Sequence, residues 1–535
     1  FQWAISEATL PNDGFKGVNI ALSISWFIPL DILGSTCQQA FNPLLSVRLK
    51  RLLILFKLFY HRWLFSMHRK NFGRNRVLQP SAGYTPTSEQ EVLDILDRHQ
   101  GQSIRAVGRL HSWSEAILGD GVQLDLRRLN DVLLEPDGDD FVATIGAGCQ
   151  VKRILKELNR GGATLHSLGL IDVQTIAGAI STGTHGSGRH SMSHYVEEVR
   201  LARYDKSTGK AFIDKISAGD ELLAARCSLG ALGIILSVKL RCRTQYNVQE
   251  HFTESKTLEG VLSAEESYPL QQFFFIPWRW SYFTQHRCED TGKRSFFAKL
   301  YRLYWLGVMD YGMHLKILFL QRVLRSRRMI RFSFRRVVPL FLIRKWKVTD
   351  RSSSMLVMKH EAFRHIEIEL FVPRDQLPEA LKFTKEVIEV AGSKDTSLSE
   401  ANQRRIDDLG MQEDIAELQN QYCQHYPICV RRVLPDDTLI SMASGEDQDW
   451  YAVSFISYAK PKRRAGFDLF SKFMARSMSQ LFRARPHWGK VSPLEASELT
   501  ALYPKFDTFR TVSKTLDPQG VFQNEWTTAL LDADD

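Results

Sequence analysis

Residues 175–188 read TIAGAISTGTHGSG and constrain the fold more than any other stretch of the sequence. Four glycines, Gly178, Gly183, Gly186 and Gly188, stand there among serines, threonines and a single histidine. Such small residues cannot build a core, but they let backbone N–H groups approach an anion closely and adopt a positive φ. The stretch is not the G-x-G-x-x-G fingerprint of a Rossmann fold. By itself it predicts either a cradle for a nucleotide pyrophosphate or a flexible surface loop.

The composition is that of an ordinary globular protein with several domains. Of the 535 residues, 44% are hydrophobic and 24% are charged. The seven cysteines are scattered and form no C-x-x-C pair, which argues against a disulfide framework or a zinc site. Cys423, His425 and Cys429 lie close together in a spacing that matches no familiar metal site, so we expect them to be structural and predict no bound metal.

The N-terminal residues 1–78 are unusually apolar and basic. Residues 18–33 form an apolar run that Pro29 and Asp31 interrupt, which makes it marginal for a membrane-spanning helix. Residues 44–70 mix Leu, Ile and Phe with Lys and Arg. This pattern favours an amphipathic helix on an anionic membrane surface. The alternative is a helix that packs on the protein's own core with extended Lys and Arg side chains.

Residues 297–347 repeat that character, because long apolar runs alternate there with many Arg and Lys residues. Binding to nucleic acid is disfavoured, since the interleaved residues are mostly aliphatic rather than aromatic. A helical insertion that faces a membrane fits better. We therefore expect a membrane-associated protein with no nucleic-acid partner.

The middle of the chain reads as mixed strands and helices joined by glycine-rich turns. From about residue 80 to 245 this predicts an α+β nucleotide-binding domain. Residues 365–373, HIEIELFVP, alternate as a strand does, and residues 377–390 form an amphipathic helical pattern. Residues 228–234, SLGALGI, predict either a close approach of the backbone to a ligand or a tight turn into a strand.

Four motifs together carry a family resemblance. They are VGRLHSW at 107–113, SLGLIDVQTIAGAISTGTHGSG at 167–188, SLGALGIILSVKLRC at 228–242, and the C-terminal pair RPHWGK at 485–490 and LDPQGVFQN at 516–524. In order and spacing they resemble the sugar-1,4-lactone oxidases. This family includes L-gulonolactone oxidase, D-arabinono-1,4-lactone oxidase and, more distantly, alditol oxidase. All are flavoproteins of the vanillyl-alcohol-oxidase type.

The resemblance implies an α+β fold of two parts. Residues 79–245 would form a PCMH-type FAD-binding domain of two small subdomains. Residues 246–535 would form an α+β substrate (cap) domain, with residues 485–530 returning to the flavin. Residues 1–78 and much of 300–347 lie outside the resemblance, and residues 1–78 remain the predicted membrane-associating segment.

The resemblance also implies FAD, bonded covalently through His111 to the flavin 8α-methyl group. The family text at this point is G-x-G-H-S, whereas this chain has Gly108-Arg109-Leu110-His111-Ser112, with Leu110 in place of a small residue. The glycine-rich stretch becomes the pyrophosphate cradle. The predicted cofactor-binding residues are Gly108, His111, Ser112, Ile176, Gly178, Ser181, Thr182, Gly183, Thr184, His185, Gly186, Gly230, Gly233, Ile234, Ile235 and His487.

Three residues are candidates for the catalytic chemistry. Glu367 and Glu369 lie two apart on one predicted strand and so share a face, where burial of both would raise the pKa of one. The alternative is a solvated strand face. Lys490 ends the motif HWGK and matches the family's active-site lysine, with a surface lysine as the alternative. Alditol oxidase has an arginine where this chain has Glu369, which counts against a simple alditol oxidase.

The implied reaction is oxidation of a sugar-1,4-lactone hydroxyl by hydride transfer from C2 to flavin N5, with O2 as acceptor and H2O2 as product. One alternative is an FAD-dependent polyol or sugar dehydrogenase that passes electrons to a membrane or protein acceptor. Another, of a different class, is a membrane-surface scaffold without catalysis. The substrate rests on analogy, because fold and function are separable.

Overall fold

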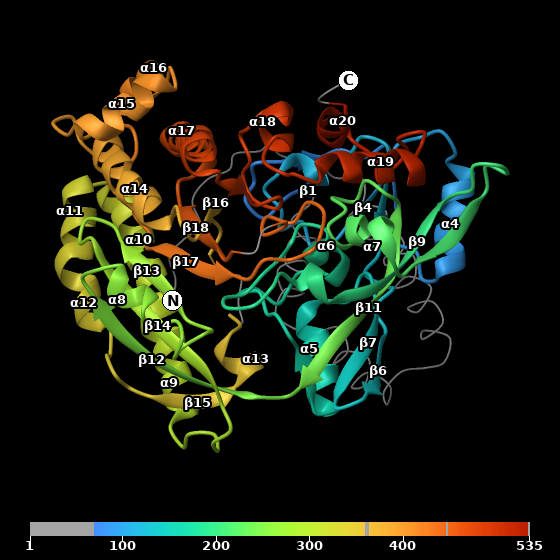
Figure 1. Cartoon of the computed structure of the whole chain (residues 1–535), viewed down its shortest axis with the longest axis horizontal. Helices are drawn as coiled ribbons and strands as arrows, with labels where there is room; N and C mark the ends of the chain where they lie inside the picture. Colours follow the sequence, from blue (N-terminus) through green and yellow to red (C-terminus); the bar gives the residue numbers. More distant parts are fainter. Residues whose placement is uncertain (1–68, 359–362, 446–447, 533–535) are drawn as a thin grey trace, which may run out of the picture. The chain divides into compact units, whose positions relative to one another are not determined.

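This computed structural model describes residues 69–358, 363–445 and 448–532 (Figure 1). The chain divides into two compact units, Phe1–Met67 and His68–Asp535, and all described residues belong to the second. The predicted segment 18–33 and almost all of 44–70 therefore lie outside the described residues. The first described elements are the paired strands β1 (Arg69–Lys70) and β2 (Val77–Leu78).

A small parallel sheet opens the nucleotide-binding part. Its strand order is β3-β5-β4, and β5 pairs in parallel with both neighbours. A helix, α4, follows β3 and begins after Ser88, whose side chain accepts a hydrogen bond from the Glu91 N–H. The bounds are β3 (Ala82–Tyr84), α4 (Glu89–Arg98), β4 (Ile104–Val107), η1 (Glu115–Ile117) and β5 (Val122–Asp125).

A second, antiparallel sheet completes this part, with strand order β10-β9-β11-β7-β6 and β8 also paired to β11. Its strands alternate with short helices that bury apolar faces, as Val151, Ile154 and Leu158 do on α5. The bounds are β6 (Val132–Asp137), β7 (Asp140–Gly146), α5 (Val151–Arg160), β8 (Ala163–Leu165), α6 (Ile176–Ile180), η2 (Met192–Tyr195), β9 (Val196–Tyr204), β10 (Ala211–Ile216), α7 (Gly219–Arg226) and β11 (Ile234–Thr244).

The rest of the chain is built on an eight-stranded antiparallel sheet of order β15-β12-β14-β13-β17-β18-β16-β19. Its central strands are buried on both faces, and every residue of β16 is buried. The bounds are β12 (Asn247–Ser255), α8 (Glu259–Leu262), β13 (Gln272–Ile276), β14 (Ser281–Asp290), β15 (Val348–Arg351), α13 (Ser352–Met355), β16 (Ile366–Pro373), β17 (Ile428–Val433), β18 (Trp450–Ser457) and β19 (Arg485–Pro486).

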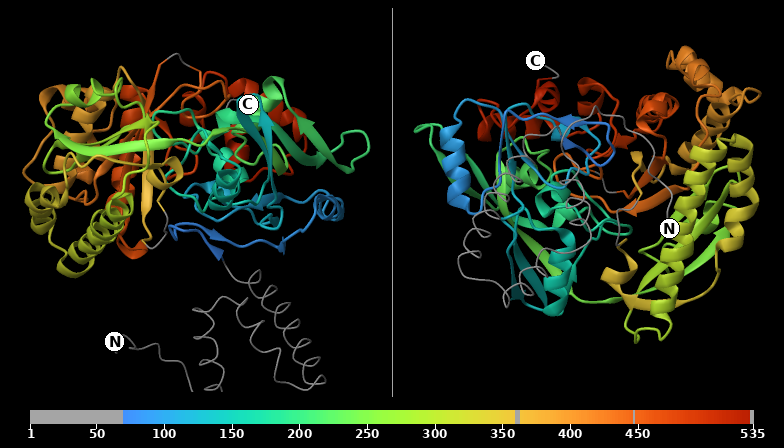
Figure 2. Two further views of the ribbon diagram at one scale, coloured as in Figure 1. Left: turned by 90° about the horizontal axis from the view of Figure 1, so that it is seen from below. Right: turned by 180° about the vertical axis from the view of Figure 1, so that it is seen from behind.

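Helices cover this sheet (Figure 2). The segment 297–347 is helical, as predicted, and the helices α14 and α17 pack on each other and on β16. None of the helices in the described part of the chain is long and apolar enough to cross a bilayer. The bounds are α9 (Ala298–Tyr304), η3 (Trp305–Gly312), α10 (Met313–Phe319), η4 (Leu320–Leu324), α11 (Arg327–Phe332), η5 (Ser333–Val337), α12 (Val338–Phe341), α14 (Leu377–Gly392), α15 (Glu400–Asp408), α16 (Gln412–Leu418), η6 (Pro461–Arg463) and α17 (Ala465–Phe482).

The segment 517–524 contacts β4 and η1, far away in the sequence. The Ile104 N–H donates to the Val521 carbonyl at 2.8 Å. The Asn524 amide donates to the carbonyls of Glu115 and Leu118, each at 2.9 Å. The last described elements are α18 (Ala496–Thr500), α19 (Phe506–Leu516) and α20 (Glu525–Leu531) (Figure 1).

Candidate active site

A cavity of about 270 Å³ collects residues from both parts of the fold. Four loops contribute to its wall, at residues 105–113, 169–185, 229–235 and 487–490. The eight-stranded sheet contributes side chains from β16, β17 and β18. The predicted cofactor loops and the predicted catalytic strand therefore meet at one cavity.

The glycine-rich stretch forms one wall. Thr184 and His185 are buried there, so the stretch is not a flexible surface loop. The side chain of its first residue, Thr175, packs tightly against the loop that follows β4, because a Cβ added at Gly108 would lie 2.3 Å from the Thr175 hydroxyl oxygen. Only glycine fits at Gly108, and the cavity is consequently lined there by main chain rather than by side chains.

The loop that carries His111 is tied to the C-terminal motif. The Trp113 N–H donates to the Gly489 carbonyl at 2.9 Å, and the Ser112 hydroxyl donates to the same oxygen at 3.2 Å. The His111 ring stacks on Phe72, with ring centroids 5.1 Å apart. Leu110 has a φ of 57°, in the left-handed region that favours glycine. The loop therefore keeps a glycine-like backbone at Leu110, where the family has a small residue.

Arg105 fastens three segments around the cavity. Its guanidinium donates to the carbonyls of Gly230 at 2.8 Å, Leu229 at 2.9 Å and Phe522 at 2.5 Å, and also to that of Ala116. Burial lowers the pKa of Arg105 to about 10, so it stays charged at neutral pH. The sequence analysis missed this residue, because nothing in its local pattern sets it apart.

Glu367 and Lys490 form an ion pair in the cavity wall. Only 7% of the Glu367 side chain and 15% of the Lys490 side chain are exposed, so neither lies on a solvated surface. The Lys490 ammonium also lies 4.6 Å from the centre of the Trp113 ring. His365 Nε2 lies 3.9 Å from the Glu367 carboxylate. A carboxylate and an ammonium are thus held together where a substrate can reach both.

Glu369 is fully buried beside them and is paired differently. Arg431 donates to its Oε1 at 2.5 Å and the Ser454 hydroxyl donates to the same oxygen at 2.6 Å. No hydrogen-bond partner for Oε2 occurs within the described ranges. A buried carboxylate oxygen without a partner is costly, and this one belongs to a cavity-lining residue. It therefore indicates that a polar group of a bound molecule completes this site.

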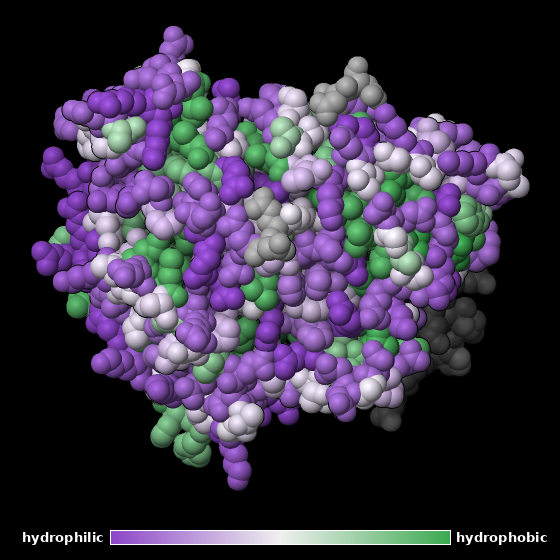
Figure 3. Space-filling view, in the orientation of Figure 1, coloured by the Kyte–Doolittle hydropathy of each residue, from purple (hydrophilic) through white to green (hydrophobic). Residues whose placement is uncertain are grey.

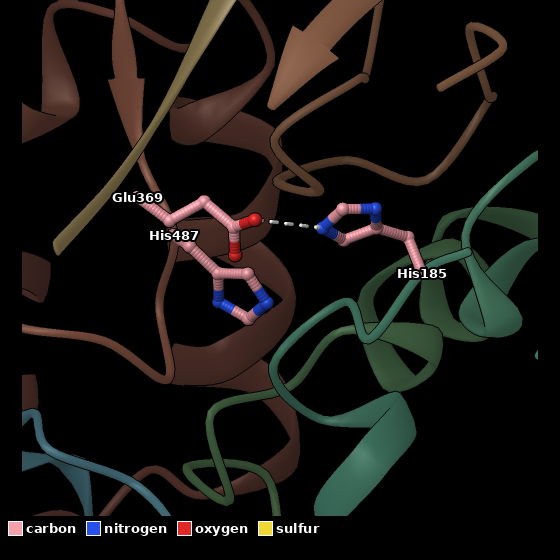
Figure 4. Close-up of side chains that lie close together, drawn as sticks. All are labelled: His185, Glu369 and His487. Atoms are coloured by element: carbon pink, nitrogen blue, oxygen red, sulfur yellow. Dashed lines mark ion pairs between the residues drawn. The ribbon is translucent and has the colours of Figure 1, made fainter. Parts of the chain in front are cut away.

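Two buried histidines flank Glu369 (Figure 4). His185 Nε2 lies 3.7 Å from Glu369 Oε1, while its Nδ1 donates to the Gly186 carbonyl at 2.9 Å. His487 Nδ1 accepts a hydrogen bond from the Gly489 N–H at 2.9 Å. The ligand atoms of these three residues all lie within 4.8 Å of one another, which is close enough to hold a metal ion. The Arg431 charge on the same carboxylate opposes a cation there.

The two carboxylates differ in their pKa values. Burial raises the pKa of Glu367 above that of an ordinary glutamate. The Lys490 charge opposes this effect without cancelling it, and the nearby Glu369 charge adds to it. Burial alone would also raise the pKa of Glu369, but Arg431 and His185 outweigh it and hold the pKa well below the usual range. Burial also lowers the pKa of His365 to about 3, which keeps that ring neutral at physiological pH. Glu367 is therefore the carboxylate better suited to exchange a proton.

An aromatic wall runs away from these charges. His365 lies 5.6 Å from Tyr458 by ring centroids, Tyr458 lies 5.6 Å from Tyr426, and Tyr426 lies 5.6 Å from His314 on α10. All four side chains line the cavity, together with Ile171, Met358 and Ile456. One part of the lining is thus polar and another part is apolar.

Most of the predicted site residues line this cavity, and four do not. The lining includes Gly108, His111, Ser112, Gly178, Ser181, Thr182, Thr184, His185, Gly230, Gly233, Ile235, Glu367, Glu369, His487 and Lys490. Ile176, Gly183, Gly186 and Ile234 are absent from it. Ile176 and Ile234 are instead buried in the core, at 0% and 1% exposure.

The cavity suits FAD on two counts. Main chain at Gly108, Gly178 and Gly230 lines one side, where the backbone can lie close to a nucleotide. The polar groups of Glu369 and Lys490 lie in the wall of the same cavity. The residues that would hold the cofactor are those of the loops at 108–113, 174–185 and 229–235.

Comparison with known proteins decides the family. The family model described as D-arabinono-1,4-lactone oxidase matches residues 238–530, and that described as FAD binding domain matches residues 80–208. The chain belongs to the D-arabinono-1,4-lactone oxidase family. It is an FAD-linked oxidoreductase, and the α+β fold with a PCMH-type FAD-binding domain is confirmed.

Individual members of this family differ in their names. A long-chain alcohol oxidase from an uncultured marine euryarchaeote is 74% identical over 87% of this chain and 97% of its own length. An L-gulono-1,4-lactone dehydrogenase of Mycobacterium tuberculosis is 28% identical over 86% of this chain and 98% of its own length. Among solved structures, a solvent-stable cholesterol oxidase is similar in fold, with a TM-score of 0.68 and 14% identity over 87% of this chain and 97% of its own.

Proposed function

We propose that this oxidoreductase converts a CH–OH group to a carbonyl, with Glu367 and Lys490 handling the hydroxyl proton. The observation that carries the proposal is the ion pair of these two residues in the wall of the cavity that the cofactor loops line. FAD, when bound, supplies the two-electron acceptor. The chain's own side chains then have to hold the substrate oxygen and take its proton.

Glu367 is the better proton acceptor of the two glutamates. Its raised pKa brings the carboxylate closer to the operating pH, which favours general base catalysis. The Lys490 ammonium holds the substrate oxygen and stabilises negative charge that develops there. Glu369, neutralised by Arg431, offers its second oxygen to a substrate hydroxyl without acting as a base.

The family favours a sugar-1,4-lactone as the substrate. A second candidate, a long-chain alcohol, is favoured by the aromatic wall from His365 to His314 and by the name of the 74% identical relative. The polar groups would hold the hydroxyl in either case, and the apolar lining would accept an alkyl chain.

A substrate panel separates the two candidates. Purified protein would be assayed with a redox dye against 1,4-lactones, alditols and primary alcohols of increasing chain length in detergent. A kcat/KM that rises with chain length by at least tenfold supports the long-chain alcohol, and a preference for lactones supports the sugar substrate. A folded, FAD-loaded sample that turns over none of them would favour the non-catalytic scaffold and contradict the proposal.

We infer that O2 is the electron acceptor and that H2O2 is produced. The alternative is a dehydrogenase that uses a membrane or protein acceptor. A relative named L-gulono-1,4-lactone dehydrogenase is 28% identical to this chain. The ratio of H2O2 formed to substrate consumed in air decides between them. A ratio near one supports the oxidase, whereas turnover only with an added dye or quinone supports the dehydrogenase.

We further infer a covalent FAD bond at His111. Its support is the position of His111 in the cavity wall, on a loop whose backbone at Leu110 is glycine-like. After acid precipitation, flavin fluorescence should stay with the protein pellet and should be lost to the supernatant in His111→Ala. Flavin released from the unaltered protein would contradict the bond and leave the flavoenzyme intact.

A further inference from the structure

A helical hairpin covers part of the eight-stranded sheet. Its first arm runs through α9, η3, α10 and η4 without a break, from Ala298 to Leu324. Arg325 turns the chain with a φ of 51°, and Ser326 caps the second arm, Arg327–Phe341. We call residues 296–343 the α9–α12 hairpin (Figure 2).

The inner face of the hairpin is an ordinary part of the core. Its buried apolar side chains include Ile317, Leu320, Ile330, Phe334, Val338 and Leu342, each at most 6% exposed. The Arg331 guanidinium lies 4.6 Å from the centre of the Trp278 ring and also donates to the Gly392 carbonyl. This inner face therefore accounts for the packing of the hairpin on the sheet.

The outer face is apolar as well, which packing on the sheet does not explain. Over the described ranges, seventeen large hydrophobic side chains are exposed, and fourteen of them belong to the hairpin. Leu340 is 80% exposed, Val323 64% and Leu303 63%. The opposite side of the molecule in Figure 3 is mostly hydrophilic, with apolar patches broken up by polar residues. An exposed apolar surface of this extent marks an interaction site.

The same surface is strongly basic. The hairpin contains ten Lys and Arg and one acidic residue, Asp310, which is buried. Its net charge of +9 is close to the +10 of the whole chain. Arg322, Arg328 and Arg336 form no ion pair with any carboxylate in the part of the chain that the structure describes, so their charge is available to an anionic partner.

We propose that the α9–α12 hairpin docks the protein on an anionic lipid bilayer, lying in the interface without spanning it. Apolar side chains with interspersed Arg and Lys are the pattern of interfacial helices. A second copy of the chain is a poorer partner, since its hairpin would bring a charge of +9 against +9. Nucleic acid is a poorer partner too, because nine of the fourteen exposed apolar side chains are not aromatic and give bases nothing to stack on.

Docking would bring the bilayer close to the active site. On α10, His314 lines the cavity, while Leu315 and Phe319 of the same helix are 57% and 51% exposed. One helix thus has one side on the cavity and another on the proposed lipid surface. A lipophilic substrate could reach the cavity from the membrane, although the docking itself does not depend on the proposed function.

The test is flotation of the full FAD-loaded chain with vesicles. Vesicles of phosphatidylcholine alone are compared with vesicles that contain 30% phosphatidylglycerol, at low and high salt. The apolar variant is Leu303→Gln/Val323→Gln/Leu340→Gln, and the charge variant is Arg322→Gln/Arg328→Gln/Arg336→Gln. The matched controls are Leu133→Gln, at a 59% exposed leucine outside the hairpin, and Arg128→Gln/Lys206→Gln/Lys394→Gln, which removes three exposed charges elsewhere.

The parent protein and both controls should float with anionic vesicles, and each hairpin variant should bind at least tenfold less. Flavin absorbance and Tm, unchanged in every variant, exclude misfolding. Equal binding by hairpin variants and controls would overturn the proposal and assign any binding to another part of the chain. No binding by the parent protein would also overturn it. A shift from dimer to monomer in lipid-free hairpin variants would show that a second copy covers the surface instead.

Discussion

Arg431 and Glu369 pair across an intervening strand. Arg431 is on β17 and Glu369 is on β16, and β18 lies between these strands in the sheet. The two side chains still meet at 2.5 Å, and Ser454 of β18 donates to the same carboxylate oxygen at 2.6 Å. Three neighbouring strands are therefore joined through one buried oxygen atom.

Removal of Arg431 alone should cost more stability than removal of both charges. Arg431→Met leaves a buried carboxylate uncompensated, which costs about 3–5 kcal/mol, whereas Glu369→Gln/Arg431→Met should recover most of that loss. Urea unfolding of the single and double variants measures the coupling. The exposed pair Arg404 and Glu400, 3.6 Å apart, is the control and should show a coupling below about 1 kcal/mol. Equal losses in single and double variants would contradict the argument.

Glu367 should set the acidic limb of the pH–activity profile. The ionised carboxylate of Glu367 is the active form. The value of kcat/KM is therefore highest above the pKa and falls as the pH drops through it. Because burial raises this pKa, the midpoint should lie above the value of about 4.3 for an ordinary glutamate. Glu367→Gln should lose roughly 10²- to 10⁴-fold in kcat/KM and abolish this limb. The exposed Glu400→Gln is the control, and an unchanged acidic limb in Glu367→Gln would assign the proton to another group.

At Leu110 the glycine variant should be more stable than the alanine variant, which is the reverse of the usual order. A non-glycine residue at φ 57° carries roughly 1–2 kcal/mol of strain, so Leu110→Gly should be more stable than Leu110→Ala by about 1 kcal/mol. At Leu133, which lies in the strand β6, the alanine variant should be the more stable one. Thermal unfolding of the four variants measures both differences. The same order at both positions would contradict the strain argument.

Buried histidines should make the protein sensitive to acid. Burial lowers the pKa of His425 to about 4, so this residue is neutral when folded and takes up a proton near pH 6.5 when unfolded. The stability that this neutral histidine gives the folded state is fully present above about pH 6.5. It is lost as the pH falls towards 4, at up to about 1.4 kcal/mol of unfolding free energy per pH unit.

The variant His425→Gln tests this point. Glutamine can replace both hydrogen bonds, the one that His425 donates to the Cys423 carbonyl and the one that it accepts from the Tyr458 N–H. Stability measured between pH 4 and 7 should depend less steeply on pH in this variant, and His99→Gln, at a partly exposed histidine, is the control. An unchanged slope in His425→Gln would show that other groups dominate the acid response.

Sequence reasoning found the parts of the site that lie close together along the chain. The two-residue spacing of Glu367 and Glu369 places both on one strand face, and the glycine-rich stretch has its own local signature. Arg431 and Ser454 could not be found in this way, because they reach Glu369 only through the order of strands in the sheet. His314 was missed for a similar reason, since it lies far along the sequence from the cavity loops and reaches the cavity only through the packing of α10.

Four predicted cofactor residues lie outside the cavity lining. Ile176, Gly183, Gly186 and Ile234 belong to the matching motifs but do not line the cavity. A motif preserves packing residues together with those that touch a ligand, and the sequence alone does not separate the two. At Gly186, a Cβ would lie 2.6 Å from the Leu168 carbonyl oxygen, so close packing accounts for the glycine.

The contact between the first and the last parts of the described chain also bears on biosynthesis. Arg105 holds the Phe522 carbonyl across a separation of 417 residues, and Lys490 comes late in the chain as well. At roughly 5–20 residues per second, translation from one to the other takes roughly 20–80 seconds. Throughout that time the nascent chain lacks the segment that joins the cofactor loops. Capture of FAD in its final setting must therefore follow the synthesis of Phe522.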